Sequence, residues 1–414
     1  MTTASPRSPG ELPPGELEIF LVAAEESGDR LGAALMKALR QRSAGPVRFS
    51  GVGGTEMTAA GLNSLFPVGD FSIIGFAAIP GRLPRIVRHM VQTVRAVLAQ
   101  RPHALVIIDS PAFTLRVARY AHWFDRSIPI IDYVSPSVWA WRAGRARAMG
   151  AYVDHVLALL PFEPDVHRRL GGPPCSYVGH PLIDDVFKLR PNEVEARRRS
   201  SDPPVVLAMP GSRSSEVTRL AGIFGEALAR VAERAGPIEV VVPTVPHLLA
   251  QVTQATSTWP ISTWPIKPRI VVEEADKQAA LRMARAALAK SGTTTLELAV
   301  AGVPMVAAYK VAPLEAAVIR RLVRVPSYIL ANLVLGQNVV PALVQEECTP
   351  ERLAEALTPL IGDTPERRRQ IEAFATLNAI MEIGSRTPAA RAADIVLGLV
   401  RRDRGAMAAP GANG

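Results

Sequence analysis

Short apolar runs alternate with amphipathic helical stretches along most of the chain. In the first half, "EIFLVAAE" is followed by the helical pattern "DRLGAALMKALRQ", and "HALVIIDS" is followed by "TLRVARYAHWF". A second series starts near residue 204 and includes "PVVLAMPGS", "IEVVVPTV" and "VPMVAAYK", again with helices between. Buried runs of this length, separated by helices, are typical of a parallel sheet covered on both faces. The pattern therefore predicts an α/β protein with two Rossmann-like domains.

A polar, charged and proline-bearing stretch separates the two series. It covers residues 189–204, and we interpret it as a linker between an N-terminal domain, 18–188, and a C-terminal domain, 205–402. Residues 1–17 are rich in Pro, Gly, Ser and Glu and are expected to form a disordered leader, with a flexible tail at 403–414. Two such halves of similar size predict a ligand cleft between them, at the C-terminal ends of both sheets.

The charge balance narrows the class of partner. The 414 residues include 47 Lys and Arg against 38 Asp and Glu, which gives a formal net charge of +9. This excess favours an anionic partner, such as nucleic acid, a phosphorylated substrate or an acidic lipid surface. Because aromatic residues make up only 5% of the chain and no zinc-finger, RNP-type or helix-turn-helix signature occurs, we expect no nucleic-acid partner.

The cysteines and the lengths of the apolar runs indicate the cellular compartment of the protein. Cys175 and Cys348 lie far apart and lack metal-ligand spacing, which favours a reducing cytosol over a disulfide framework. The sequence contains no uninterrupted run of about 18 apolar residues, so we expect no membrane-spanning helix.

Two strand-to-helix turns in the second half have the residues to hold phosphate oxygens. In "MPGSRSSEV", Gly211 permits a tight turn, Ser212 can cap the following helix, and Arg213 offers a planar fork that suits a diphosphate. Taken alone, this stretch is equally well explained as an ordinary capped loop with a surface arginine.

The second turn, "KSGTTTLELAVAG", shifts that balance. Ser291, Gly292 and Thr293 supply hydroxyl and backbone N–H groups where a strand meets a helix. Glu297 follows one turn later, where it could accept both hydroxyls of a ribose or simply interact with the helix dipole. Two such turns in one half favour a nucleotide-diphosphate donor. Because neither turn is a Walker sequence and "GVGG" is not GxGxxG, ATP hydrolysis and NAD chemistry lack support.

Acidic and small residues mark the strand ends of the first half. The stretch "EESGD" contains Glu25, Ser27, Gly28 and Asp29 where the first strand meets its helix. Asp109 ends "ALVIID" at the C-terminal edge of another strand, where it could act as a general base on a hydroxyl. The local alternative for Asp109 is a cap on the helix that follows.

Taken in order along the chain, the motifs resemble those of the lipid-A-disaccharide synthase family. The resemblance is carried by "YVSPSVWAWRAGR", "LALLPFEPDV", "YVGHPL", "PGSRSSEVTRL" and "SGTTTLE", and it extends from about Ile19 to at least Leu360. It implies a GT-B glycosyltransferase that joins UDP-2,3-diacylglucosamine to 2,3-diacylglucosamine 1-phosphate. UDP leaves, the anomeric centre is inverted, and neither a metal nor another cofactor takes part.

The resemblance also implies roles for single residues. Asp109 matches the aspartate that the family needs for activity and is the candidate base on the acceptor's 6-hydroxyl. Arg213 and Glu297 match positions associated with UDP, and Asn332 matches an asparagine beside the donor.

The chain departs from the family at several positions. The family reads DAPDFN where this chain has "DSPAFT", so that Ala112 replaces an acid, and PNLIAGR where it has "ANLVLGQ", so that Gln337 replaces an arginine. The loss of the acid leaves Asp109 as the base, and the loss of the arginine implies weaker donor binding.

The stretch "SPSVWAWRAGR" then acquires an interpretation. Trp139 and Trp141 are expected to wall the acceptor site, since indoles offer both an apolar face and a polar edge. Arg142 or Arg145 would pair with the acceptor's 1-phosphate. The alternative is that the tryptophans pack between domains while the arginines bind a carboxylate.

The lipid substrates suggest an explanation for "DFSIIGFAAIPGRLPRIVRHM". An apolar face flanked by arginines suits an element that dips into an anionic inner-membrane surface, although a core helix with a solvated face has the same pattern. We therefore expect a cytoplasmic protein that associates peripherally with the inner face of the inner membrane. The membrane contacts would be Ile73, Ile74, Phe76, Ile79, Leu83 and Ile86.

Two other functions are also compatible with a UDP-sugar site or with a lipid-binding surface. One is another UDP-N-acetylglucosamine-type GT-B enzyme, either a 2-epimerase or a lipid-linked N-acetylglucosaminyltransferase, although these lack the SPSVWAWR segment. The other is a non-catalytic peripheral protein that binds UDP-sugars or lipid. The segment "RRLVRVPSYILANLVLG" could line the cleft or form a subunit contact in a homodimer.

Overall fold

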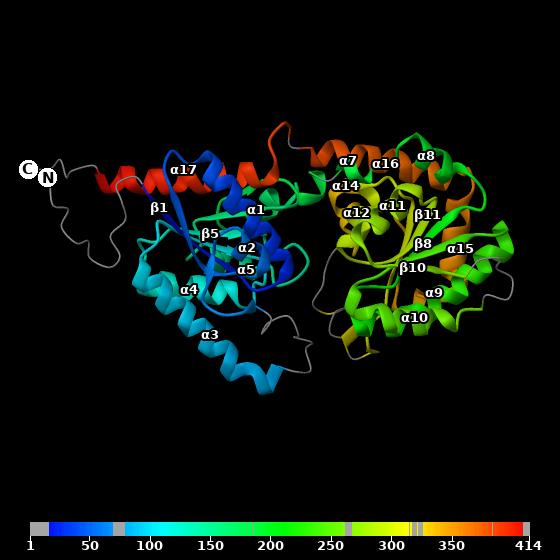
Figure 1. Cartoon of the computed structure of the whole chain (residues 1–414), viewed down its shortest axis with the longest axis horizontal. Helices are drawn as coiled ribbons and strands as arrows, with labels where there is room; N and C mark the ends of the chain where they lie inside the picture. Colours follow the sequence, from blue (N-terminus) through cyan, green and yellow to red (C-terminus); the bar gives the residue numbers. More distant parts are fainter. Residues whose placement is uncertain are drawn as a thin grey trace, which may run out of the picture. The chain divides into compact units, whose positions relative to one another are not determined.

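Two compact units, each built on one parallel sheet, make up the chain (Figure 1). The computed structural model describes residues 16–68, 79–184, 186–260, 267–313, 315–316, 321, 326–382 and 384–408. The first unit contains the described residues up to Pro181 together with the last helix, and the second unit runs from Leu182 to Glu382. The predicted α/β class with two parallel sheets is confirmed.

The sheet of the first unit has seven strands in the order β3-β2-β1-β4-β5-β6-β7. Alternate side chains of β1 point to opposite faces, so that Ile19 and Leu21 pack under α1 and α17 while Phe20 and Val22 pack under α3 and α4. Both faces are therefore buried, which explains the uninterrupted apolar run. The strands are β1 (Leu17–Ala23), β2 (Val47–Val52), β3 (Asn63–Ser64), β4 (Ala104–Ile108), β5 (Ile130–Tyr133), β6 (His155–Ala158) and β7 (Cys175–Tyr177). The helices are α1 (Glu26–Arg42), α2 (Thr55–Ala59), α3 (Ile79–Gln100), α4 (Thr114–Phe124), α5 (Gly144–Met149), α6 (Glu163–Leu170) and α17 (Pro388–Ala408).

The sheet of the second unit has six strands in the order β10-β9-β8-β11-β12-β13. One face is covered by α9 and α15, and the apolar residues of α9 recur three or four positions apart, as in Val217, Leu220 and Phe224. The strands are β8 (Val205–Met209), β9 (Glu239–Pro243), β10 (Arg269–Val271), β11 (Ala286–Lys290), β12 (Met305–Tyr309) and β13 (Ala342–Val344). The helices are α7 (Val186–Leu189), α8 (Glu193–Ser200), α9 (Ser214–Ala235), α10 (Leu249–Ser257), α11 (Glu274–Met283), α12 (Thr293–Val300), α14 (Leu330–Leu335), α15 (Pro350–Ile361) and α16 (Pro365–Met381).

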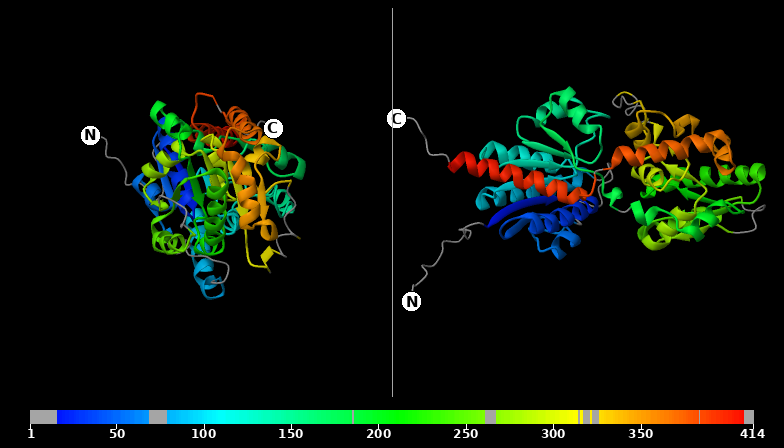
Figure 2. Two further views of the ribbon diagram at one scale, coloured as in Figure 1. Left: turned by 90° about the vertical axis from the view of Figure 1, so that its right-hand side faces the viewer. Right: turned by 90° about the horizontal axis from the view of Figure 1, so that it is seen from above.

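The units differ from the expected domain boundaries in two places. Half of the expected linker, 189–204, is helix α8, which starts at a capping box formed by Asn192 and Glu195. The last helix, α17, was expected in the C-terminal domain but packs along α1 of the first unit (Figures 1 and 2). Its buried side is fixed by apolar residues such as Val396 and by an ion pair between Arg42 and Asp394.

None of the helices in the described part of the chain combines the length and the apolar character that crossing a membrane requires.

Candidate functional site

The two phosphate-competent turns of the second unit lie side by side. They follow β8 and β11, which are hydrogen-bonded neighbours in the sheet. At the first turn, the carboxylate of Glu216 folds back, and its Oε2 accepts hydrogen bonds from the N–H groups of Ser212 (3.0 Å) and Arg213 (3.3 Å). Gly211 has φ of +132°, and a Cβ there would lie 2.4 Å from Glu216 Oε2. Only glycine therefore allows this turn to close over the carboxylate.

Two cations lie beside that carboxylate. The Lys290 ammonium is 3.0 Å from Glu216 Oε1, and it lies 5.5 Å from the centre of the Tyr309 ring. The Arg213 guanidinium is 3.6 Å from the same oxygen, and its side chain is 78% exposed. Sequence reasoning selected Arg213 but missed Lys290 and Glu216, although Lys290 directly precedes the second turn. The turn edge thus has two positive groups that could meet a diphosphate.

At the second turn, most of the polar groups of Ser291 are committed within the protein. Its hydroxyl donates to the carbonyl of Tyr328 at 2.7 Å, and its N–H donates to the carbonyl of Ala308 at 2.8 Å. Gly292 is the N-cap residue of α12, and Thr293 is exposed in the first turn of that helix. The turn therefore presents Gly292 and Thr293, rather than Ser291, to a ligand.

Glu297 and Asn332 both have partners inside the unit. A carboxylate oxygen of Glu297 lies 2.8 Å from the ammonium of Lys277. Asn332 is 3% exposed; its amide donates to Ser327 Oγ and to the carbonyl of Val340. Its Oδ1 accepts from the N–H groups of Val339 and Val340. The structure thus gives Asn332 a structural task, which is to hold the segment that follows α14.

In the first unit, the ends of β1 and β4 bring Ser27 and Asp109 together. The Ser27 hydroxyl donates to Asp109 Oδ2 at 2.8 Å, and the N–H of Ser110 donates to Oδ1 at 2.7 Å. Asp109 has φ of +54°, a conformation that costs free energy for a residue with a side chain. Gly28 lets α1 approach this point, since a Cβ there would lie 3.2 Å from the carbonyl oxygen of Ile108. The aspartate is therefore held in one orientation at the carboxyl edge of the sheet.

The acidic residues near Ser27 lie beside a cavity, and one of them, Asp29, also caps a helix. The carboxylate of Asp29 is buried and accepts hydrogen bonds from the N–H groups of Gly54, Glu56 and Met57, so it caps α2. Glu25, Glu26 and Asp29 itself border a cavity of ≈ 1120 Å³ at the ends of β1 and β2. The apolar wall of this cavity is formed by Leu62, Leu65, Phe66, Pro67 and Val68.

The tryptophan and arginine side chains that follow β5 are stacked together. The guanidinium of Arg142 lies 4.4 Å from the centre of the Trp141 ring, and that of Arg145 lies 5.5 Å from the same ring. Trp139 packs edge-on against Phe162, with ring centres 5.6 Å apart. Stacking of this kind orients guanidinium groups and leaves their N–H edges available to an anion.

Two buried side chains of α6 hold this loop. Glu163 Oε1 accepts from the indole N–H of Trp139 at 3.3 Å, and Oε2 accepts from the N–H of Leu160 at 3.0 Å. One turn later, His167 Nε2 lies 2.9 Å from the hydroxyl of Ser135. Residues four apart share a helix face, so one face of α6 fixes both ends of the segment 135–139. Sequence reasoning missed this pair, which the quoted motif "LPFEP" contains in part.

A buried carboxyl group lies under the same loop. Asp132 in β5 is 2% exposed, and its Oδ2 has no hydrogen-bond partner among the described residues. Burial and the nearby carboxylates of Asp109 and Glu163 raise the pKa of Asp132 well above its ordinary value. Sequence reasoning overlooked Asp132, although an acid within an apolar strand is an unusual feature.

Raising the pH from 5 to 8 should destabilise the wild type relative to Glu163→Gln by about 3 kcal/mol. Burial raises the pKa of Glu163 from 4.5 to about 7, and the carboxyl faces Asp132 in β5 and Cys175 in β7. Between these two values the folded state keeps a proton that the unfolded state has released. The stability contributed by this group therefore falls as the pH rises and is lost above pH 7.

Urea unfolding at pH 5, 6, 7 and 8 measures this difference. The neutral amide of Glu163→Gln cannot titrate, so its stability should rise relative to the wild type across the series. Asp165→Asn, an exposed change on the same helix, should follow the wild type. Parallel curves for wild type and Glu163→Gln would show that Glu163 is ionised throughout.

The expected membrane segment is described only in part. Ile73, Ile74 and Phe76 lie outside the described residues, as do the side chains of Ile79 and Leu83. Ile86 is half-buried and packs against the core beneath α3 and α4.

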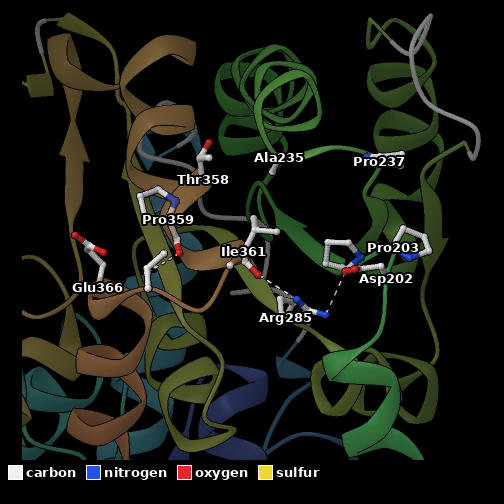
Figure 3. A pocket seen from close by; sticks show the side chains of 12 residues that line it. Asp202, Pro203, Ala235, Pro237, Arg285, Thr358, Pro359, Ile361 and Glu366 are labelled. Carbon is white, nitrogen blue, oxygen red and sulfur yellow. Dashed lines mark hydrogen bonds and ion pairs between the residues drawn. The ribbon is translucent and has the colours of Figure 1, made fainter.

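A second cavity, of ≈ 1160 Å³, opens at the opposite edge of the second sheet (Figure 3). It is lined by residues that precede β8 and β11, among them Pro203 and Arg285. The guanidinium of Arg285 donates to the carbonyl oxygens of Arg199, Ser201 and Ile361, so its hydrogen bonds are used within the protein. This cavity is therefore separate from the turns that could bind a nucleotide.

Comparison with known proteins adds a family and close relatives. A family model described as lipid-A-disaccharide synthetase matches residues 19–396. The lipid-A-disaccharide synthase of Nitrobacter winogradskyi is 57% identical over 94% of this chain and 97% of its own length. That of Rhodospirillum centenum is 42% identical over 93% of this chain and 95% of its own length.

Solved structures with the same fold are much more distant in sequence. The UDP-GlcNAc 2-epimerase from Neisseria meningitidis bound to UDP-GlcNAc matches with a TM-score of 0.57 at 12% identity, over 94% of this chain and 99% of that one. Acinetobacter baumannii MurG matches with a TM-score of 0.56 at 14% identity, over 93% and 100%. The calicheamicin glycosyltransferase CalG4 has a TM-score of 0.55 at 18% identity, over 94% and 99%. These matches support the expected GT-B fold.

Proposed function

Because this chain belongs to the lipid-A-disaccharide synthase family, we propose that it joins UDP-2,3-diacylglucosamine to 2,3-diacylglucosamine 1-phosphate. The chain is a glycosyltransferase of lipid A synthesis. Its products are UDP and a β-1′,6-linked disaccharide 1-phosphate. The observation that best supports an active transferase is the Asp109 carboxylate, held at the carboxyl edge of the first sheet by Ser27 and by the N–H of Ser110.

Asp109 acts as the general base in this proposal. It takes the proton of the acceptor's 6-hydroxyl as that oxygen attacks C1 of the donor sugar, and the bond between C1 and the UDP oxygen breaks. One displacement of this kind inverts the anomeric centre. The hydrogen bonds from Ser27 and Ser110 keep the carboxylate oriented, so little reorganisation is needed when the hydroxyl arrives.

The second unit binds the leaving UDP. Negative charge grows on the diphosphate as the sugar departs, and fixed positive groups stabilise it. Arg213 and Lys290 supply two cations, both paired with Glu216 in the absence of ligand. Gly292 and Thr293 lie at the N-terminal end of α12, where backbone N–H groups face anions. Gly211 and Ser212 lie at the N-terminal end of α9, and the N–H of Ser212 serves the diphosphate only if Glu216 gives up its hydrogen bond. Glu297 serves the ribose hydroxyls only if it gives up part of its contact with Lys277.

The acceptor binds along the loop that follows β5. Trp139 and Trp141 provide amphipathic surfaces for the sugar and for the start of an acyl chain. Arg142 and Arg145, held against Trp141, pair with the 1-phosphate. The cavity beside Glu25 has an apolar wall, from Leu62 to Val68, that suits an acyl chain.

Arg142→Ala and Arg145→Ala should each raise the acceptor KM roughly tenfold and leave the donor KM within about twofold. Each change removes a charge that pairs with the acceptor's phosphate and leaves the turns of the second unit intact. Initial rates with one substrate varied at a time measure both constants. Arg147→Ala, an exposed change on α5, the helix that also contains Arg145, should alter neither KM. Equal effects on donor and acceptor would contradict the assignment.

The acyl chains of both substrates also support a peripheral site of action on the inner face of the inner membrane. In this proposal the protein is cytoplasmic and meets an anionic lipid surface through Ile73, Ile74, Phe76, Ile79 and Leu83, while Ile86 packs against the core. We also propose a homodimer, in which the apolar stretch that leads into α14 forms the contact between subunits.

The acceptor dependence of UDP release tests the function. Purified protein should release UDP only when both lipids are present. UDP release from the donor alone would contradict a transferase that needs its acceptor. Interconversion of UDP-N-acetylglucosamine with its C2 epimer would instead support the epimerase alternative, and UDP-sugar binding without any turnover would support a non-catalytic protein.

A further inference from the structure

One carboxylate occupies the anion position at the turn between β8 and α9. Oε2 of Glu216 accepts hydrogen bonds from the N–H groups of Ser212 (3.0 Å) and Arg213 (3.3 Å). Its Oε1 lies 3.0 Å from the Lys290 ammonium and 3.6 Å from the Arg213 guanidinium. Backbone N–H groups at a helix N-terminus, together with cationic side chains, are the groups that bind a phosphate. The carboxylate therefore lies where a diphosphate would be bound.

A helix cap alone accounts for only part of this arrangement. Glu216 is the third residue of α9, and a glutamate at that position commonly accepts a hydrogen bond from the N–H of the N-cap residue. That contact uses Oε2. The other oxygen pairs with Lys290 at the end of β11, the strand beside β8 that leads into the second phosphate-competent turn (Figure 1). The carboxylate of Glu216 thus connects the two turns.

The Glu216 carboxylate can move away from this position without unfolding the helix. Its side chain is unbranched, and rotation about its bonds displaces the carboxylate while the backbone of α9 stays in place. The site is open to solvent on the side of Arg213, whose side chain is 78% exposed. A diphosphate and the carboxylate cannot bind the same groups at once, and their negative charges repel each other.

We propose that Glu216 is an internal anion that the donor's diphosphate displaces. The inference rests on the proposed function, which places UDP at these two turns. Without donor, the carboxylate compensates the charges of Lys290 and Arg213 and keeps both beside the turn. When the donor binds, its phosphate oxygens take over these groups. After transfer the carboxylate competes with UDP for them, which weakens product binding and favours release.

Titration calorimetry of the full chain with UDP tests this exchange. Glu216→Gln preserves the size of the side chain and an oxygen that can accept from the N–H of Ser212, but it removes the negative charge. The variant should bind UDP at least about fivefold more tightly than the wild type, because the diphosphate no longer competes with a charged group. Uridine, which has no phosphate, should bind both proteins with the same affinity within about twofold.

Glu195 in α8 offers a matched control. It too is the third residue of its helix, accepts from the N–H of the N-cap residue Asn192 at 3.0 Å and lies 2.8 Å from a cation, Arg282. Its side chain is 15% exposed, against 13% for Glu216. Glu195→Gln therefore removes an equivalent cap and ion pair away from the two turns. It should leave the affinity for UDP within about twofold of the wild type.

A structure of the wild type with UDP gives a second test that depends on no variant. Phosphate oxygens should have replaced Glu216 Oε2 at the N–H groups of Ser212 and Arg213. The exchange is ruled out if the carboxylate keeps both hydrogen bonds while UDP is bound. Equal or weaker UDP binding by Glu216→Gln would also overturn it, and either result leaves the proposed function intact. A wild type that binds no UDP would contradict the proposed function together with this inference.

Discussion

Replacing Asp109 with Asn should lower kcat by about 10²–10⁴-fold and leave the donor KM close to the wild-type value. The amide is the same size as the carboxylate, and its oxygen can still accept the hydrogen bond from the N–H of Ser110. The Ser27 hydroxyl can turn to accept from the new amide nitrogen. The fold and the orientation at this position should persist, while the ability to take a proton is lost.

Rates of UDP release with both lipids, together with a thermal melt, measure this change. The same exchange at the exposed Asp165, Asp165→Asn, should keep kcat within about twofold, because its carboxylate makes a surface ion pair with Arg168 far from the reacting groups of Asp109 in sequence and contact. A folded Asp109→Asn protein with wild-type kcat would remove Asp109 from the role of base. Loss of folding would instead mean that the carboxylate is needed to hold α1 on β4.

Asn332→Ala should destabilise the second unit by about 3–5 kcal/mol, with a fall in Tm of roughly 10 °C. The change removes the hydrogen bonds of Asn332 to Ser327, Val339 and Val340. Ser327 Oγ still accepts from Ile329, and the N–H of Val339 still donates to the carbonyl of Gln337, but within the described structure the carbonyl and the N–H of Val340 lose the buried partner that Asn332 gave them. Because the Asn332 side chain is 3% exposed, we expect this loss of stability to exceed any direct effect on the donor.

Asn338 offers the matched control for Asn332. It is exposed and makes one long hydrogen bond to the carbonyl of Pro326, so Asn338→Ala should change Tm by no more than about 2 °C. Thermal melts and donor KM values for both variants separate the two interpretations. An Asn332→Ala protein of normal stability with a raised donor KM would show that Asn332 contacts the donor, as the resemblance implied.

The fold could be predicted because its signal is local. A strand buried on both faces must be apolar throughout, as in β1 and β8, and the helices between such strands show their own spacing. The turns after β8 and β11 could be predicted for the same reason, since glycine and hydroxyl residues directly follow a strand. These two turns lie side by side because β8 and β11 are neighbouring parallel strands, and such strands have their carboxyl ends at the same edge of the sheet.

The remaining features depend on contacts between distant residues. The cap that Asp29 forms on α2 and the hydrogen bonds of Asn332 appear only when the chain is folded, and both residues had been interpreted as ligand contacts. The return of α17 to α1 depends on matching surfaces rather than on a local motif. In the sequence, the aromatic residues of α4 fit the pattern of an amphipathic helix. Only the structure shows that the side chains of Trp123 and Phe124 are exposed to solvent.

The most direct test of the central claim is the identity of the product. Wild-type protein, UDP-2,3-diacylglucosamine and 2,3-diacylglucosamine 1-phosphate are incubated with a metal chelator, and the lipid product is examined by mass spectrometry and by the coupling of its new anomeric proton. We expect one UDP for each disaccharide and a β-1′,6 linkage. UDP without disaccharide, or an α-linked product, would contradict a single inverting displacement.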